Sequence, residues 1–131
     1  GDRVFIGGDF TTIGKESRMQ LAAVDDDTGA LLPWDSRSDA PFVEFLVSDG
    51  VLYAAPDIIN PFEESARFMA FDVETAAEVE WAVDFGKEEF AVRTMTAGND
   101  LLFVAGWFTD SENRMYTSLI AVDKSDGSVQ W

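Results

Sequence analysis

Apolar residues in this chain occur in short runs separated by clusters of Gly, Asp, Asn, Ser and Pro. Short runs rich in β-branched and aromatic residues, bounded by turn-forming residues, are typical of β-strands. In the middle of the chain such runs lie at 43–47, 51–55, 67–73 and 78–83, and none is long enough for a typical helix. The pattern therefore predicts an all-β protein in which one unit holds four short strands.

The runs belong to a repeat. The stretch AVDDDTGALLPW recurs later as AFDVETAAEVEW and again as AVDKSDGSVQW. Each copy ends in a tryptophan, at Trp34, Trp81 and Trp131. A second set aligns independently as VFIGGDF, LYAAPDI and LFVAGWF. The third set, FVEFLVSDG and AVRTMTAGND, occurs only twice, so the first repeat lacks its first strand.

Four short antiparallel strands per repeat is the size of a β-propeller blade. The sequence thus predicts one β-propeller-type segment over residues 1–131, with about three four-stranded blades at 1–34, 42–83 and 91–131. The first of these blades is partial, because it lacks its inner strand. Since propellers typically have four to eight blades, we expect a longer polypeptide or further copies to complete this incomplete propeller. A missing innermost strand favours the longer polypeptide, and two associated chains would give about six blades.

The recurring residues have a structural explanation. The aspartate that ends the third strand can accept hydrogen bonds from the next backbone amides. It recurs as Asp25, Asp72 and Asp123. Gly29 and Gly127 suit the φ > 0 position of the turn that follows, whereas the middle repeat has Ala76 there, which predicts another turn type or mild strain. Each tryptophan is expected to cover a neighbouring blade.

The segment VFIGGDFTTIGKESRMQLAAVDDDTGALLPW resembles secreted bacterial and archaeal β-propeller repeats of the delta-sixty type. The ends of the repeats resemble the tryptophan-docking motif of quinoprotein propellers, A-x-D-x-x-x-G-x-x-x-W. The resemblance extends over three successive repeats and implies a propeller fold, in which each tryptophan packs on the next blade. The middle repeat departs most, with Ala55-Pro56 in place of Gly-Gly. Because propellers support many unrelated functions, the resemblance is weak for activity.

Charge and composition limit the classes of function that this chain can have. The chain has 25 acidic and 9 basic residues and a net charge of −16, which would repel nucleic acids and anionic lipid. Such acidity suits an extracellular, cell-surface or halophilic setting, and the alternative to secretion is the cytoplasm of a halophile. It is equally explained by an ordinary acidic surface that keeps the protein soluble. Cys and His are both absent, which excludes disulfides and imidazole or thiolate catalysis within the chain. No apolar run approaches the length of a transmembrane helix.

Enzymatic interpretations find little support in the residues. A quinone-dependent dehydrogenase of the resembled type commonly uses paired cysteines, which are absent, so no cofactor is predicted. The glutamate pairs at 63–64 and 88–89 could serve a glycoside hydrolase only at a separation that sequence does not give. The acidic stretches DDDTG and DKSDG do not fit a calcium-binding loop and are better explained as turns. Metal binding stays undecided, and catalytic residues of a propeller enzyme would lie mostly outside this segment.

A binding role has more support. The loops that follow the second strands are long and unequal, and loops on a rigid scaffold commonly carry recognition. Trp107 stands where the first repeat has Asp9, so it falls outside the repeating set of tryptophans. We expect an aromatic and acidic patch suited to a sugar or a cation, formed by Asp57, Phe62, Trp107 and Asp110. The alternative is that Trp107 and Phe62 pack beneath their own loops. The predicted function is a non-enzymatic structural and interaction module with a protein or glycan partner.

Overall fold

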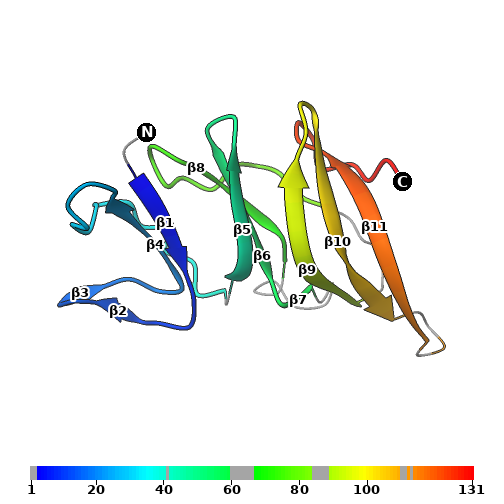
Figure 1. The fold of residues 1–131 in the computed structure, drawn as a ribbon, viewed down its shortest axis with the longest axis horizontal. Coiled ribbons are helices and arrows are strands. Elements are labelled where there is room, and N and C mark those ends of the chain that lie inside the picture. The colour runs from blue at the N-terminus through cyan, green and yellow to red at the C-terminus, as the bar shows by residue number, and fades with distance from the viewer. Residues whose placement is uncertain (1–2, 41, 60–66, 84–88, 110–111, 113) are drawn as a thin grey trace.

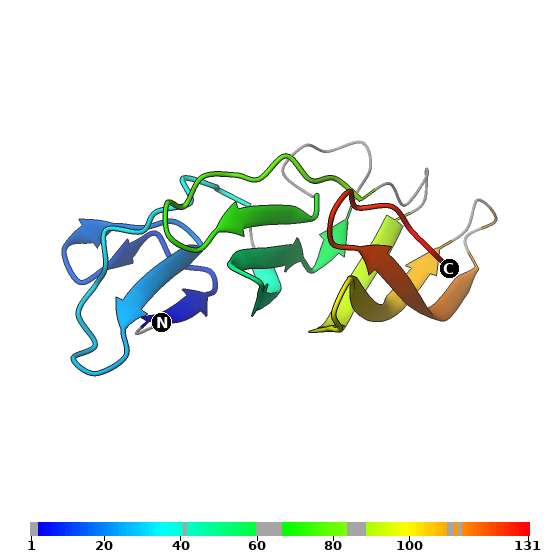
Figure 2. The same cartoon turned by 90° about the horizontal axis from the view of Figure 1, so that it is seen from above.

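The computed structural model describes residues 3–40, 42–59, 67–83, 89–109, 112 and 114–131. These residues form β-strands, turns and loops and contain no helix, which confirms the all-β prediction. Antiparallel sheets lie side by side in chain order, and the two chain ends are at opposite ends of the row (Figure 1). The described residues form no closed ring of sheets, as the view from above also shows (Figure 2).

Three of the sheets correspond to the three sequence repeats. The first sheet pairs β1 (Arg3–Gly7) with β4 (Leu21–Asp25). The second has the order β5 (Phe42–Ser48), β6 (Val51–Pro56), β8 (Met69–Asp72). The third has the order β11 (Met115–Asp123), β10 (Leu101–Thr109), β9 (Glu89–Ala97), β7 (Ile58–Ile59). A small hairpin joins β2 (Thr12–Ile13) to β3 (Glu16–Ser17).

The second and third strands of each repeat pair in the same register in all three sheets. The residue that begins the second strand of each repeat pairs with the aspartate that ends the third strand, in the pairs Arg3↔Asp25, Val51↔Asp72 and Leu101↔Asp123. The first sheet has no counterpart of β5 and β9 among the described residues, as the sequence predicts. Equivalent positions of the three sheets are therefore defined by pairing, and they can be compared one by one.

The prediction of a full fourth strand is wrong. Residues 78–83 make only an isolated bridge, Phe71↔Glu78, and the other repeats have the matching bridges Val24↔Leu31 and Val122↔Val129. The third strand of the middle repeat is also shorter than predicted, since β8 spans only Met69–Asp72. After the bridge the chain leaves its own sheet, because the tryptophan that follows contacts the next sheet along the row.

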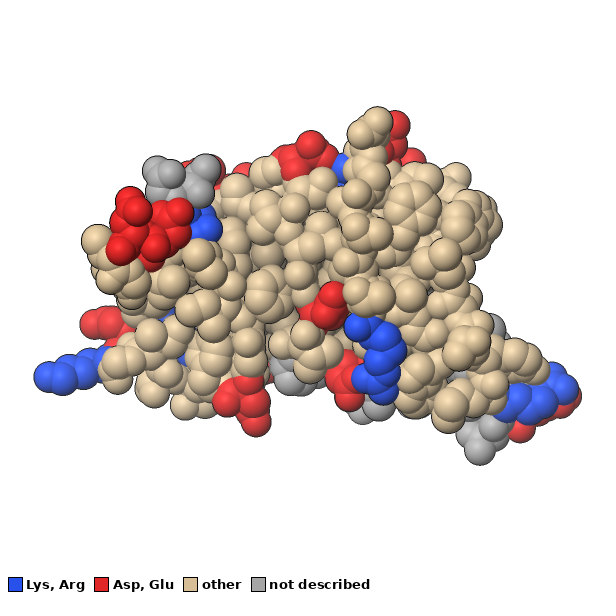
Figure 3. Space-filling view, in the orientation of Figure 1, with Lys and Arg blue, Asp and Glu red and all other residues tan. Residues whose placement is uncertain are grey.

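Two apolar clusters fill the spaces between neighbouring sheets. Trp34 lies in the cluster between the first and second sheets, which also holds Leu21, Leu52 and Phe71. Trp81 lies in the cluster between the second and third sheets. The charged side chains lie mainly toward the edges of the face shown in Figure 3, and uncharged side chains occupy most of its middle. The core is thus built at the junctions between sheets.

Candidate functional site

The turn after each third strand is organised by its aspartate. Asp25 Oδ1 accepts hydrogen bonds from the Thr28 amide at 2.8 Å and the Thr28 hydroxyl at 2.5 Å. Asp72 accepts equivalent bonds from Thr75, at 2.7 and 2.8 Å. Asp123 accepts bonds from the amide and hydroxyl of Ser125, at 2.8 and 2.6 Å. All three carboxylates are therefore held by their own turns.

These bonds lower the pKa of each aspartate below its ordinary value. The hydroxyl of Thr28 has the largest effect on the pKa of Asp25, the Thr75 amide on that of Asp72, and the Ser125 hydroxyl on that of Asp123. A carboxyl group with a lowered pKa in the folded state stabilises the fold above its unfolded pKa. That contribution is lost as the pH falls through the folded pKa. Hydrogen bonds within the turn thus lower all three pKa values, as is expected of aspartates with a structural role.

The tryptophan of one repeat binds the turn of the next repeat. Trp34 Nε1–H donates to the Asp72 carbonyl oxygen at 3.1 Å, and Trp81 Nε1–H donates to the Asp123 carbonyl oxygen at 3.2 Å. Both rings are buried and make edge-to-face contacts, such as Trp34 with Phe5 at 5.0 Å and Trp81 with Tyr53 at 5.0 Å. Each junction thus combines a desolvated aromatic ring with one directional hydrogen bond.

At the loop end of the sheets, the structure brings together two of the four residues predicted for binding. Asp57 follows β6, and Trp107 lies in β10 at the equivalent position of the next repeat. They are joined by Arg93, whose Nη1 lies 2.8 Å from Asp57 Oδ1. The Arg93 guanidinium carbon lies 5.4 Å from the centre of the Trp107 ring. We call Asp57, Arg93 and Trp107 the loop-end cluster.

Arg93 reaches this position because of a β-bulge. In the pairing of β9 with β10, Thr94 is opposite Ala105 and Val92 is opposite Gly106, so Arg93 is left without an opposite residue. Such bulges redirect a side chain and are frequent beside functional sites. The second sheet has the same irregularity at Val43, between Phe42 and Glu44. The bulge is therefore a feature of the repeat, and the arginine is specific to the third sheet.

Sequence reasoning did not identify Arg93. It lies within the run AVRTMTA, whose pattern predicts only a strand. Aligned as sequence, the runs AVRTMTA and FVEFLVS place Arg93 opposite Glu44, so no departure from the repeat marks it, and only the strand pairing makes Val43 its equivalent. The other predicted residues, Phe62 and Asp110, and the glutamates at 63, 64 and 88 lie outside the described residues.

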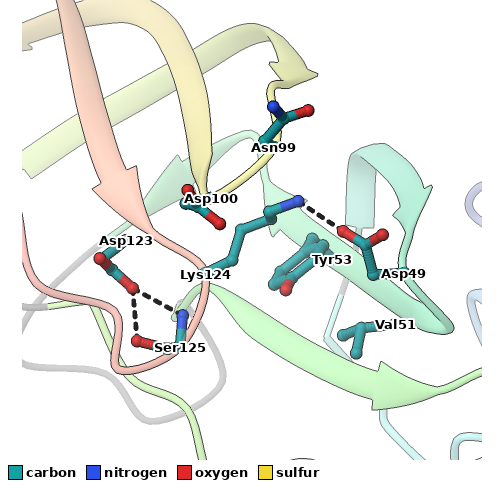
Figure 4. A pocket seen from close by; sticks show the side chains of 8 residues that line it. All are labelled: Asp49, Val51, Tyr53, Asn99, Asp100, Asp123, Lys124 and Ser125. Carbon is teal, nitrogen blue, oxygen red and sulfur yellow. Dashed lines mark hydrogen bonds and ion pairs between the residues drawn. The ribbon is translucent and has the colours of Figure 1, made fainter.

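At the opposite end, the structure has a hollow between the second and third sheets. It has a volume of about 560 Å³ and is lined by Asp49, Val51, Tyr53, Asn99, Asp100, Asp123, Lys124 and Ser125 (Figure 4). Lys124 lies across it, with Nζ 2.5 Å from Asp49 Oδ2 and 2.9 Å from the Gly98 carbonyl oxygen. The Lys124 bond lowers the pKa of Asp49. Burial, followed by the charges of Asp49 and Asp123, raises the pKa of the Tyr53 phenol.

The hollow lies where the second junction differs from the first, in the residue that begins the second strand and in the β5–β6 hairpin, which carries Asp49 and has no counterpart in the described part of the first sheet. Val51 occupies the position that Arg3 holds in the first sheet. Arg3 crosses the first junction and donates to the Val73 carbonyl oxygen at 2.5 Å and to Glu74 at 2.8 Å. Because Val51 is too short to do this, the second junction is bridged from the other side by Lys124. The hollow therefore has a structural explanation that requires no ligand.

The described residues hold neither a metal-ion cluster nor a membrane-spanning helix. Among these residues, no group of three or more Asp, Glu, His or Cys side chains is placed to hold a metal ion. The described part of the chain also has no helix with the length and apolar character needed to cross a membrane.

The chain was compared with protein-family models, with curated proteins and with solved structures, and none of the three comparisons gave a match.

Proposed function

We propose that this chain is a segment of a secreted or cell-surface β-propeller protein, in which three successive blades form a non-enzymatic scaffold that binds a glycan at the loop-end cluster. The propeller arrangement is supported by the twice-repeated junction, in which a tryptophan donates to the aspartate carbonyl of the next turn. A scaffold joined in this way holds the sheet that carries Arg93 and Trp107 in a fixed relation to the strand end that carries Asp57, as recognition requires.

The loop-end cluster is the observation on which the binding proposal depends. Arg93 and Asp57 are both more than half exposed although they form an ion pair, and Trp107 is partly exposed beside them. An aromatic ring offers an apolar face to the C–H groups of a sugar. A carboxylate accepts hydrogen bonds from sugar hydroxyls, and a guanidinium donates to sugar oxygens. A small cation is less well suited, because Arg93 already occupies the cationic position.

A glycan array probed with the labelled 131-residue chain tests this proposal. We expect Trp107→Ala to weaken binding to the glycans that wild type selects by more than about tenfold, because exposed aromatic anchors commonly contribute most of the binding energy. Arg93→Ala should also weaken it. Arg67→Ala is the matched control, since Arg67 is a partly exposed, ion-paired arginine of the second repeat outside the cluster.

Two results would overturn the glycan assignment. One is the absence of any glycan bound by wild type at millimolar concentration. The other is binding that both Trp107→Ala and Arg93→Ala leave unchanged. If wild type binds no glycan but binds a folded protein, and Trp107→Ala loses that binding, the ligand of the cluster is a protein.

A further inference from the structure

At the two ends of the row of sheets, several apolar side chains are exposed. The equivalent side chains at the interior junctions are buried. We define the trailing face by Leu119, Val129 and Trp131 of the third sheet. We define the leading face by Val4, Ile6 and the Asp25 carbonyl of the first sheet. Figure 1 shows that these two sheets lie at opposite ends of the row.

The trailing face carries the residues that form a junction in the other repeats, but none of the described sheets packs against it. Trp131 is 60% exposed, whereas the equivalent Trp34 and Trp81 are 4% and 5% exposed. Leu119, four residues before the turn aspartate, is 52% exposed, whereas Leu21 and Phe68 at the same place are 0% and 2% exposed. The difference arises because Leu21 and Phe68 lie in junction clusters and Leu119 does not.

The leading face is the complementary half of the same junction. Val4 and Ile6 are 49% and 38% exposed. Their equivalents in the second sheet, Leu52 and Ala54, are completely buried, and so are Leu102 and Val104 in the third. Register defines these equivalences, because Val4, Leu52 and Leu102 each pair with the residue just before a turn aspartate.

Where no further repeat of a longer polypeptide covers these two faces, we infer that copies of this chain associate head to tail, with the trailing face of one copy on the leading face of the next. The argument is continuity with an interface that the chain already forms twice. In each interior junction a tryptophan donates to the carbonyl of the turn aspartate, and the Asp25 carbonyl is the corresponding acceptor at the leading face. Trp131 of a second copy supplies the matching donor.

This contact is heterologous, because it joins two different surfaces of the same chain. Such contacts close into a ring when the rotation between subunits permits it, and otherwise extend into an array. The inference rests on the propeller-type arrangement proposed above, but it does not depend on the glycan site. The loop-end cluster belongs to the second and third repeats and lies on neither face.

Sedimentation velocity over a range of chain concentrations tests the inference. We expect the mass of wild type to rise with concentration in 0.5 M salt, where repulsion between the acidic chains is screened. Trp131→Ala, Leu119→Asp and Val4→Asp should each remain monomeric at concentrations where wild type associates. Val47→Asp is the matched control for Val4→Asp, because Val47 is 50% exposed and lies in the middle sheet.

Mixing two variants distinguishes head-to-tail association from symmetric pairing. Val4→Asp retains a sound trailing face, and Trp131→Ala retains a sound leading face. Their mixture should therefore form one-to-one complexes that grow no further, although each variant alone is monomeric. Circular dichroism and the fluorescence of the buried Trp34 and Trp81 show whether each variant is folded, and Ile6→Asp replaces Val4→Asp if that variant is not.

Three results would overturn the inference. Wild type could remain monomeric at millimolar concentration in both low and high salt. The assembly could survive the variants of both faces. The mixture of two folded variants could fail to form a complex. Trp107→Ala should assemble like wild type, so that a failure of the glycan proposal and a failure of this inference are separate outcomes.

Discussion

At the scale of single residues, the turn after each third strand shows how one backbone conformation accepts different side chains. Gly29 and Gly127 have φ values of 69° and 77°, as the sequence predicts for these glycines. Ala76 has φ 61°, so the middle repeat uses the same left-handed conformation without glycine. Its methyl group is buried in the cluster around Trp34, which offsets part of the cost of that conformation.

The two glycines should differ in their tolerance of a side chain. A Cβ atom at Gly29 would meet nothing within 4 Å, whereas a Cβ atom at Gly127 would overlap the backbone carbonyl of Ala82 in the neighbouring repeat. We expect Gly29→Ala to lower the free energy of unfolding by about 1 kcal/mol through its φ alone. Gly127→Ala should cost about 1–3 kcal/mol more, because the junction must open to admit the methyl group.

Urea unfolding of both variants and of wild type, at one salt concentration, measures these losses. Equal losses for the two variants would mean that the close approach of the Gly127 turn to Ala82 is not needed for stability.

At the scale of elements, the pattern of apolar runs predicted which strands exist better than it predicted how long each strand is. The runs at 43–47 and 51–55 correspond to β5 and β6 within a residue or two. The run at 78–83 forms no strand, because its tryptophan contacts the next sheet and draws the backbone away from β8. β7 was not predicted, because it is a two-residue strand whose partner, β9, belongs to the next repeat.

Lys124 should stabilise the second junction. Its side chain is 9% exposed and bonds Asp49 and Ser48 of the second sheet, as well as the Gly98 carbonyl of its own sheet. We expect Lys124→Met to lower the free energy of unfolding by about 1 kcal/mol, since the Asp49 partner is exposed and is stabilised by water when the bond is lost.

Lys15→Met, which removes an exposed lysine from the β2–β3 hairpin, is the control and should leave the unfolding free energy nearly unchanged. Unfolding curves of equal midpoint for the two variants would show that Lys124 does not contribute to the junction.

At the scale of the whole molecule, charge opposes compaction and association, and apolar junctions favour both. The net charge of −16 is carried by a chain of 131 residues whose core lies between sheets. Repulsion among exposed acids is screened over about 10 Å at 0.1 M salt and over about 3 Å at 1 M. Hydrophobic contacts at the junctions are not weakened by this screening.

Salt should therefore raise stability. We expect the thermal midpoint of dilute, monomeric Trp131→Ala to increase from low salt to 1 M sodium chloride, as measured by circular dichroism. Using this variant separates folding from association. A midpoint that does not change with salt would contradict both the electrostatic account and the halophilic setting considered from composition.

The candidate site was predictable in part. Asp57 was placed in a binding loop by its position after a strand, and Trp107 was singled out because it breaks the repeat. Arg93 was missed, since its role depends on a bulge and on contacts with residues far from it along the chain. Its ion pair with Asp57 joins the second and third repeats, and no local pattern specifies such a pair.

By itself the sequence determined the all-β class, the period of the repeat and the aspartate turns. These features depend on residues close together in the chain, where apolar alternation and turn chemistry act locally. Only the tertiary structure decided where Trp34 and Trp81 dock, how Arg93 joins Asp57 to Trp107, and which apolar residues remain exposed at the two ends. Those outcomes depend on packing between repeats, which brings together residues that are distant in the sequence.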